Sequence, residues 1–242
     1  GDEVDLPEMY NLHGMYPFFY EDFCLGLLET MYYVPGAETY SAHNRPPKDW
    51  PFKNLGRVDI QLSYSRDGQK WHRPKDRSAL LGIGQPGEPD AGMVFPTRNG
   101  PIVINGETWI YYVAVIWPHT WWAQHEYFER YKGVLRNQSC YMLAKMPEDH
   151  WVSLDAGNQE GSLVCKPWGP PHEVFVNADA EGGSVEAELV TPYGHVIPGY
   201  SRDDCIAVMG NGKDQQIKWK NGQHPWTSIG KDHLGGVLVK FY

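Results

Sequence analysis

The stretch from Asp90 to Trp122 combines residue types that could bind a sugar. An acid leads a strand-like run, Asn105-Gly106 predicts a tight turn, and a second run dense in Trp, Tyr, Val and Ile follows. A loop containing His119, Trp121 and Trp122 comes next. Flat aromatic faces stack on sugar rings, whereas carboxylate and imidazole groups exchange hydrogen bonds with hydroxyl groups. The stretch therefore predicts one wall of a carbohydrate site.

Two long loops are expected to surround the mouth of this site. In an antiparallel pair, the first strand begins and the second strand ends at the same edge, so the loops after the second strands lie near the leading acids. We assign these loops to residues 34–57 and 117–138. Their candidate substrate-binding residues are His43, Arg45, His119, Trp121, Trp122 and His125. The alternative is that the loop aromatics pack against neighbouring parts of the fold.

Three of the loop residues raise the question of a zinc site, namely His43, His119 and His125. Their spacing matches no compact zinc pattern, and loop histidines beside a sugar more often bind hydroxyl groups. The sequence also has no glycine-rich phosphate loop and no nucleophile elbow. We therefore expect neither a metal nor another cofactor.

Composition favours an all-β protein with two domains. The 242 residues can build two cores, and 26 Gly and 19 Pro divide the apolar sequence into short strand-like runs. The formal net charge of −9 argues against nucleic acid or an anionic membrane surface as a partner. No apolar run reaches the roughly 18 residues of a membrane span, and we expect no signal peptide in the printed sequence.

A four-strand pattern occurs twice in the first part of the chain. The first copy begins at Asp5 and its fourth strand at Trp71, and the second copy begins at Asp90 and its fourth strand at Trp151. Recurring four-strand units with long loops on one side are typical of β-propeller blades. Two unrelated antiparallel meanders are the alternative interpretation.

Two blades are too few to close a propeller, which typically has about four to eight. Uncovered strand edges are a feature that folded proteins avoid. We therefore expect an N-terminal part of the propeller, in the same or another chain, or an oligomer, to cover the open blades.

The last part of the sequence predicts a second all-β domain. Its aromatic content is lower, and turn signals such as Glu181-Gly182-Gly183 and Asn221-Gly222 separate short strands. This pattern predicts a β-sandwich of jelly-roll type. We assign the first domain to residues 1–152 and the second to residues 153–242. The predicted strands of the second are Ser162–Cys165, Glu173–Asn177, Ser184–Thr191, Cys205–Val208, Gln215–Trp219 and Gly236–Phe241.

Five runs of the sequence carry a family resemblance. They are Val58 to Trp71, Asp90 to Val94, Glu107 to Tyr112, Val152 to Gly157 and Asn177 to Ala180. These runs resemble bacterial proteins related to glycoside hydrolase families 32 and 43. The resemblance implies a five-bladed β-propeller, of which this chain holds two blades, followed by a β-sandwich. It is compatible with a secreted or periplasmic bacterial protein.

The resemblance also implies that catalytic acids stand at the propeller axis, where the inner strands begin. The positions of that kind here are Asp5, Glu8 and Asp90. An acid there would protonate a leaving glycosidic oxygen, stabilise an oxocarbenium-like transition state or orient a water. The family's nucleophile or base would lie on a blade outside this chain. The expected function is glycoside hydrolysis of an oligo- or polysaccharide.

Two other functions fit the same residues. A non-catalytic glycan-binding protein would keep the aromatic loops and lack a working pair of acids. A protein-interaction scaffold is the third interpretation, because propellers host many functions.

Overall fold

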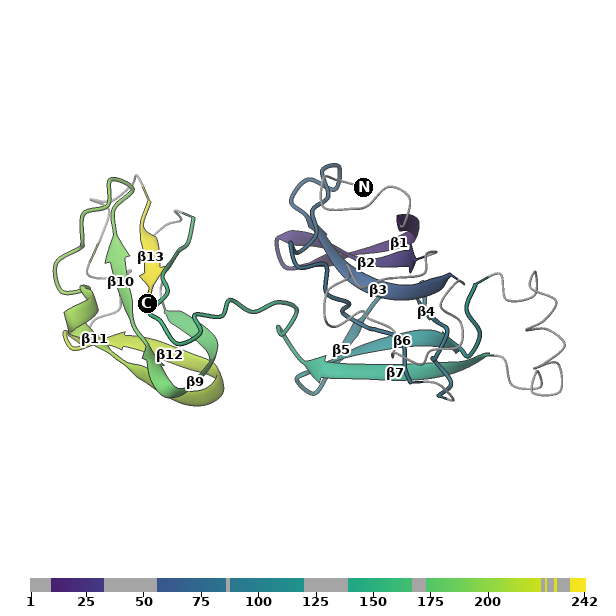
Figure 1. Ribbon diagram of the computed structural model, residues 1–242. Helices are drawn as coiled ribbons and strands as arrows, with labels where there is room; N and C mark the ends of the chain where they lie inside the picture. The colour runs from purple at the N-terminus through teal and green to yellow at the C-terminus, as the bar shows by residue number, and fades with distance from the viewer. Residues whose placement is uncertain are drawn as a thin grey trace, which may run out of the picture. The chain divides into compact units, whose positions relative to one another are not determined.

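The computed structural model describes residues 10–32, 56–85, 88–119, 139–166, 173–222, 225, 229 and 236–242. The chain divides into two compact units, Gly1–Val152 and Ser153–Tyr242 (Figure 1). All elements with described bounds are strands, apart from one short 3₁₀ helix. The prediction of an all-β protein is thus confirmed. Within the described ranges, no helix is long and apolar enough to cross a membrane.

The described strands of the first unit form one seven-stranded sheet. Its strand order is β1-β2-β3-β4-β6-β5, and β7 also pairs with β6. The strands are β1 (Tyr10–Tyr20), β2 (Phe23–Tyr32), β3 (Arg57–Ser65), β4 (Met93–Pro96), β5 (Ile102–Ile104), β6 (Glu107–Val115) and β7 (Ser139–Pro147).

This sheet contains two antiparallel strand triplets, β1-β2-β3 and β4-β6-β7, and the short strand β5 also pairs with β6. One parallel pair, Val58 with Met93, joins β3 to β4. The sheet curls, and both triplets contribute to one core (Figure 1). Leu27 and Leu62 enter that core from the first triplet, and Ile110 and Ala114 enter it from the second.

Strand periodicity explains which side chains enter the core. In β6, Ile110, Tyr112 and Ala114 are buried, whereas the alternating neighbours are partly or fully exposed. In β3, the apolar residues alternate with polar residues that are also buried. The segment after β3 covers this polar face, because the Gln61 side chain donates a hydrogen bond of 3.0 Å to the Arg77 carbonyl.

The predictions of a fourth strand from Trp71 and from Trp151 are wrong. His72 and Leu81 make only isolated bridges to β3, because Pro74 lacks an amide donor and Arg77 has a φ of 54°, which interrupts an extended path. Trp151 lies in a bend and contributes its side chain instead, with its ring centroid 5.3 Å from that of Phe18.

The hairpin predicted at Asn105-Gly106 is confirmed. Ile104 pairs with Glu107 across it, and φ is 52° at Asn105 and 77° at Gly106. A two-residue turn with positive φ at both positions matches the twist of the flanking strands, and Asn-Gly adopts it readily. This turn sets the register of β5 on β6.

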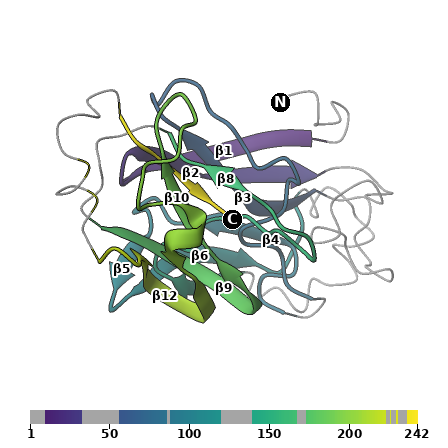
Figure 2. The same ribbon diagram turned by 90° about the vertical axis from the view of Figure 1, so that its left-hand side faces the viewer.

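The second unit has two three-stranded sheets, β10-β13-β8 and β11-β12-β9. β9 and β12 form its longest strand pair (Figure 2). Core side chains come from both sheets, including Val174 and Trp219 from one and Leu189 and Val239 from the other. The elements are β8 (Leu163–Val164), β9 (Val174–Val185), β10 (Ala187–Val190), η4 (Arg202–Asp204), β11 (Cys205–Ile206), β12 (Val208–Trp219) and β13 (Leu238–Phe241).

The turn predicted at Glu181-Gly182-Gly183 is wrong, because these residues belong to β9. They form an irregularity within the strand: Ala180 pairs with Gly210 and Val185 pairs with Val208, so β9 carries extra residues there. The turn signal therefore marked a bulge in a continuing strand. The Asn221-Gly222 turn is confirmed by a hydrogen bond of 3.0 Å from the Gly222 amide to the Trp219 carbonyl.

Candidate functional site

Four residues come together where the two strand triplets meet, and we call them the histidine cluster: His13, Glu29, Phe95 and His119. His13 lies on β1, Glu29 on β2, Phe95 on β4, and His119 follows β6. The His13 Nδ1 atom lies 3.0 Å from the Glu29 Oε2 atom. The ring centroid of His13 lies 6.0 Å from that of Phe95 and 5.8 Å from that of His119. The cluster thus combines a carboxylate, two imidazoles and an apolar ring.

A β-bulge turns His13 toward Glu29. The register of β1 on β2 shifts between Leu12 and Gly14, so His13 and Gly14 together oppose Glu29. Bulges of this kind re-aim a side chain and are common beside functional sites. A Cβ atom at Gly14 would lie only 2.7 Å from Glu29 Oε2, so a larger residue at this position would displace the carboxylate.

The Glu29 carboxylate is almost completely buried, with 2% of the residue exposed. Its Oε2 atom contacts His13, and its Oε1 atom has no hydrogen-bond partner among the described residues. Burial raises the pKa of the neighbouring Tyr16, and the negative charge of Glu29 raises it further. Tyr16 therefore keeps its proton beside the carboxylate. Burying a carboxylate is unfavourable unless polar partners surround it.

His119 is held in place through its backbone. Its amide donates a hydrogen bond of 2.6 Å to the Gly56 carbonyl. A Cβ atom at Gly56 would lie 3.2 Å from the His119 Cβ atom, which leaves little room for a larger residue. Burial lowers the pKa of His119, and the nearby His13 lowers it further, so the neutral imidazole is favoured at pH 7.

The pairing of Gly56 with His119 joins the ends of two segments. The chain enters residues 33–55 after Tyr32 and returns at Gly56, and it enters residues 120–138 after His119. These segments carry five predicted substrate-binding residues, which lie outside the described part of the structure: His43, Arg45, Trp121, Trp122 and His125. Gly56, which follows the first segment, and His119, which precedes the second, thus both lie beside the histidine cluster.

Asp90 makes its contacts with other residues. Its Oδ2 atom accepts a hydrogen bond of 3.2 Å from the Tyr112 hydroxyl, and its carbonyl accepts one of 3.1 Å from the Gly84 amide. Burial, followed by the Asp90 charge, raises the pKa of Tyr112 to about 12, so Tyr112 remains a donor at neutral pH. The other two predicted catalytic residues, Asp5 and Glu8, lie outside the described residues.

A cavity of about 430 Å³ lies beside the bulge. Its lining is mostly apolar, with a hydroxyl, an indole and a guanidinium as polar groups: Leu12, Gly14, Met15, Leu28, Ser63, Trp71 and Arg73. Small-ligand sites commonly have this mixed character and a volume of about 300–1,000 Å³. The cavity is a second candidate binding surface of the first unit.

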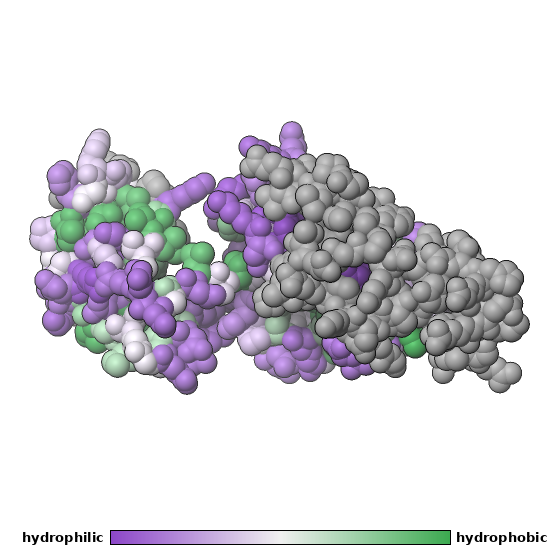
Figure 3. Space-filling model, viewed as in Figure 1, coloured by the Kyte–Doolittle hydropathy of each residue, from purple (hydrophilic) through white to green (hydrophobic). Residues whose placement is uncertain are grey.

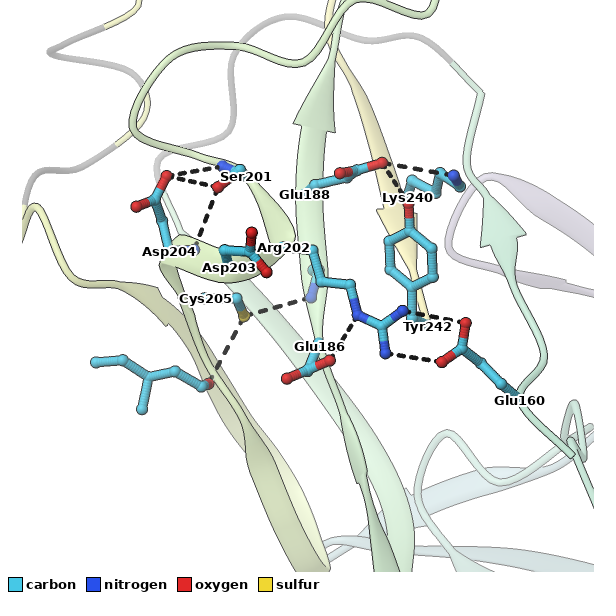
Figure 4. Close-up of polar contacts among 12 residues, drawn as sticks. Glu160, Glu186, Glu188, Ser201, Arg202, Asp203, Asp204, Cys205, Lys240 and Tyr242 are labelled. Carbon is cyan, nitrogen blue, oxygen red and sulfur yellow. Dashed lines mark hydrogen bonds and ion pairs between the residues drawn. The ribbon is translucent and has the colours of Figure 1, made fainter. Parts of the chain in front are cut away.

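The second unit contains a network of paired charges (Figure 4). The Arg202 guanidinium contacts Glu160 at 2.8 Å and Glu186 at 2.6 Å, and it lies 4.4 Å from the centroid of the Tyr242 ring. The Tyr242 hydroxyl donates to Glu188. Because these charged groups are bonded to one another, the network is suited to joining strands rather than to binding a ligand. Across the described residues, no group of His, Cys, Asp and Glu could hold a metal ion.

The second unit also presents apolar residues at its surface, and a hydrophobic area is visible on it in Figure 3. Exposed apolar side chains of this unit include Phe175, Tyr193 and Met209. Single exposed apolar residues are common on proteins, so they assign no partner.

Sequence reasoning identified His119 and missed His13 and Glu29. The signal for Glu29 was present, because it is the one acid within the otherwise apolar run from Leu25 to Met31. The contact between Glu29 and His13 had no comparable signal, because it depends on the bulge at Gly14. Comparison of the chain with protein-family models, curated proteins and solved structures found no match.

Proposed function

We propose that this chain is part of a carbohydrate-active protein and that a glycan binds beside the histidine cluster. The observation that carries the proposal is the hydrogen bond of 2.6 Å between His119 and Gly56. It brings together Gly56, which follows residues 33–55, and His119, which precedes residues 120–138, and the sequences of these two segments contain the predicted aromatic and basic ligands.

The chemistry of the cluster suits a sugar. The His13 side chain is 39% exposed, so its imidazole can reach a ligand. Phe95 adds an apolar ring at 6.0 Å from the His13 ring. Sugars present both hydroxyl groups and apolar C–H faces, which match an imidazole and an aromatic ring in one site.

The proposal includes a finer description of the fold. We interpret the two strand triplets as two blades of a five-bladed β-propeller, and the second unit as a jelly-roll-like β-sandwich. The shared core of the triplets supports the first interpretation, because successive blades must bury their faces against each other. The parallel pairing of Val58 with Met93 favours the alternative, two meanders within one curled sheet.

Glycoside hydrolysis is the reaction that we propose for the complete site. Asp90 is the candidate acid within the described residues, since the Tyr112 hydroxyl orients its carboxylate next to the start of β4. Asp5 and Glu8 are further candidates on the family resemblance alone. Hydrolysis would need two carboxylates, about 5–5.5 Å apart for retention or about 6.5–9.5 Å apart for inversion.

Glycan binding without hydrolysis is the second candidate function. Glu29 is the carboxylate of the histidine cluster, and with 2% of the residue exposed it cannot contact a glycosidic oxygen directly. This burial favours a role in shaping the site over a role in proton transfer to a substrate.

A screen of the intact protein against plant, algal and microbial glycans tests the proposal. Binding and release of reducing sugar would be measured for the wild type and for the variants Asp5→Asn, Asp90→Asn and His13→Ala. An enzyme should lose hydrolysis in the two Asn variants while it retains binding, and His13→Ala should weaken binding. Full hydrolysis in both Asn variants would refute the acid assignment. If no glycan binds to the wild type, the proposed function is wrong.

A further inference from the structure

We propose that Glu29 is a positioning residue, which fixes the ring orientation and tautomer of His13 so that His13 Nε2 accepts a hydrogen bond from a ligand hydroxyl group. The inference rests on the proposed function for the identity of the ligand. Its first part, the control of His13 by Glu29, stands on the geometry of the cluster.

The two side chains differ strongly in exposure. The Glu29 side chain is 3% exposed and the His13 side chain is 39% exposed, while His13 Nδ1 lies 3.0 Å from Glu29 Oε2. A ligand can therefore contact the imidazole but not the carboxylate. Any influence of Glu29 on a ligand must pass through His13.

The bonding capacity of the two groups determines the tautomer. An ionised carboxylate only accepts hydrogen bonds, so His13 Nδ1 must carry the proton that lies between them. In neutral imidazole the other nitrogen then has a free lone pair. His13 Nε2 is thereby an acceptor, and its natural partner on a sugar is a hydroxyl donor.

The backbone is built to bring these two residues together. The bulge places both His13 and Gly14 opposite Glu29, and a Cβ atom at Gly14 would lie 2.7 Å from Glu29 Oε2. The carboxylate can therefore hold its observed position only beside a residue without a Cβ atom, and a larger residue would displace it. The remaining buried oxygen, Glu29 Oε1, has no hydrogen-bond partner among the described residues. Besides His13, Tyr16 is a hydrogen-bond partner of the Glu29 side chain, and burying a carboxylate costs stability unless such polar partners surround it.

Binding should therefore depend on pH through His13. A protonated imidazole carries a donor in place of the acceptor at Nε2, so a ligand hydroxyl group that donates to His13 would lose its acceptor in acid. Within the described ranges, His13 interacts with Glu29 on β2 and with His119 after β6; Glu29 in turn interacts with Tyr16 on β1, and Tyr16 with Arg98 after β4.

Long-range proton–nitrogen NMR of the histidine rings tests the first part without any ligand. Wild-type His13 should show a protonated Nδ1 and an unprotonated Nε2 at pH 8. Glu29→Gln should give a mixture of tautomers, because an amide can both donate and accept. Gly14→Ala is the second variant, since it displaces the carboxylate but retains it. His150 is the matched control, because its Nδ1 lies 2.8 Å from the Glu148 carbonyl and is independent of Glu29.

Isothermal titration with a glycan identified in the screen tests the second part. At metal sites, loss of a group that orients a ligating histidine typically costs about 10–100-fold, so by analogy Glu29→Gln should weaken glycan binding about tenfold and flatten its pH profile. The double variant Glu29→Gln with His13→Ala should bind no more weakly than His13→Ala. An unchanged His13 tautomer in both Glu29→Gln and Gly14→Ala would overturn the inference. So would a double variant whose loss of glycan-binding free energy equals the sum of the losses in Glu29→Gln and His13→Ala. If the His13 tautomer changes as expected but no glycan binds, the proposed function is refuted and the control of His13 by Glu29 stands.

Discussion

Replacement of Gly92 by alanine should destabilise the first unit and displace the segment that carries His119. A Cβ atom at Gly92 would lie 2.1 Å from the Trp117 carbonyl carbon and 2.5 Å from the Pro118 nitrogen, where ordinary contact begins at 3.4 Å. Both neighbours are backbone atoms, so no side-chain rotation can relieve the overlap. The Gly92 amide also donates a hydrogen bond of 3.0 Å to the Val115 carbonyl, which holds the two backbones together.

The expected cost follows from this overlap. Forcing extra atoms into a packed region costs about 1–3 kcal/mol, and more where the backbone itself must move. With a urea m-value of about 1–3 kcal/mol per molar, the unfolding midpoint of the first unit should fall by about 1 M. The second unit has a separate core, so its own transition should remain unchanged and serve as an internal reference.

Gly82→Ala is the matched control for Gly92→Ala. Its new Cβ atom would have Ala79 Cβ as its nearest neighbour at 3.8 Å, which is ordinary contact. Because alanine restricts the unfolded chain more than glycine does, Gly82→Ala should be neutral or stabilising by up to about 1 kcal/mol. If Gly92→Ala unfolds at the same urea concentration as the wild type, the close approach of Gly92 to Trp117 is not a feature of the folded protein.

Two further predictions concern titratable contacts. Folding raises the pKa of Tyr112 from 10.0 to about 12. The stabilisation of the folded state that results is complete below pH 10 and is lost as the pH rises toward 12. Between pH 10 and pH 12, the stability of Tyr112→Phe should therefore fall less steeply with pH than that of the wild type, as monitored by circular dichroism. An identical slope would contradict the raised pKa of Tyr112. Hydrogen bonds from Arg202 lower the pKa of Glu160, so the stabilisation is present above the ordinary glutamate pKa and is lost as the pH falls through the lowered one. Glu160→Gln should flatten the acid limb of the thermal stability profile; Glu181→Gln is the comparison, and equal profiles would argue against the ion pair.

Local sequence signals predicted much of the fold. The Asn105-Gly106 turn and the apolar run after it were readable because these signals lie within a few consecutive residues. Fourth strands from Trp71 and Trp151 were predicted from a repeated four-strand pattern, and there the prediction failed. A tryptophan can fill a core from a bend as well as from a strand, and only its neighbours in space distinguish the two.

The sequence by itself determined the all-β class and most strand positions of the second unit, and it named His119 as a candidate. Tertiary structure alone decided that β3 joins β4 through Val58 and Met93, and that His13 meets Glu29. Both decisions depend on contacts between residues far apart in the chain. Strand register and bulges set such contacts. The extra residue in β1, His13, changes the direction of a side chain, but the bulge leaves no signal in the order of apolar and polar residues along the strand.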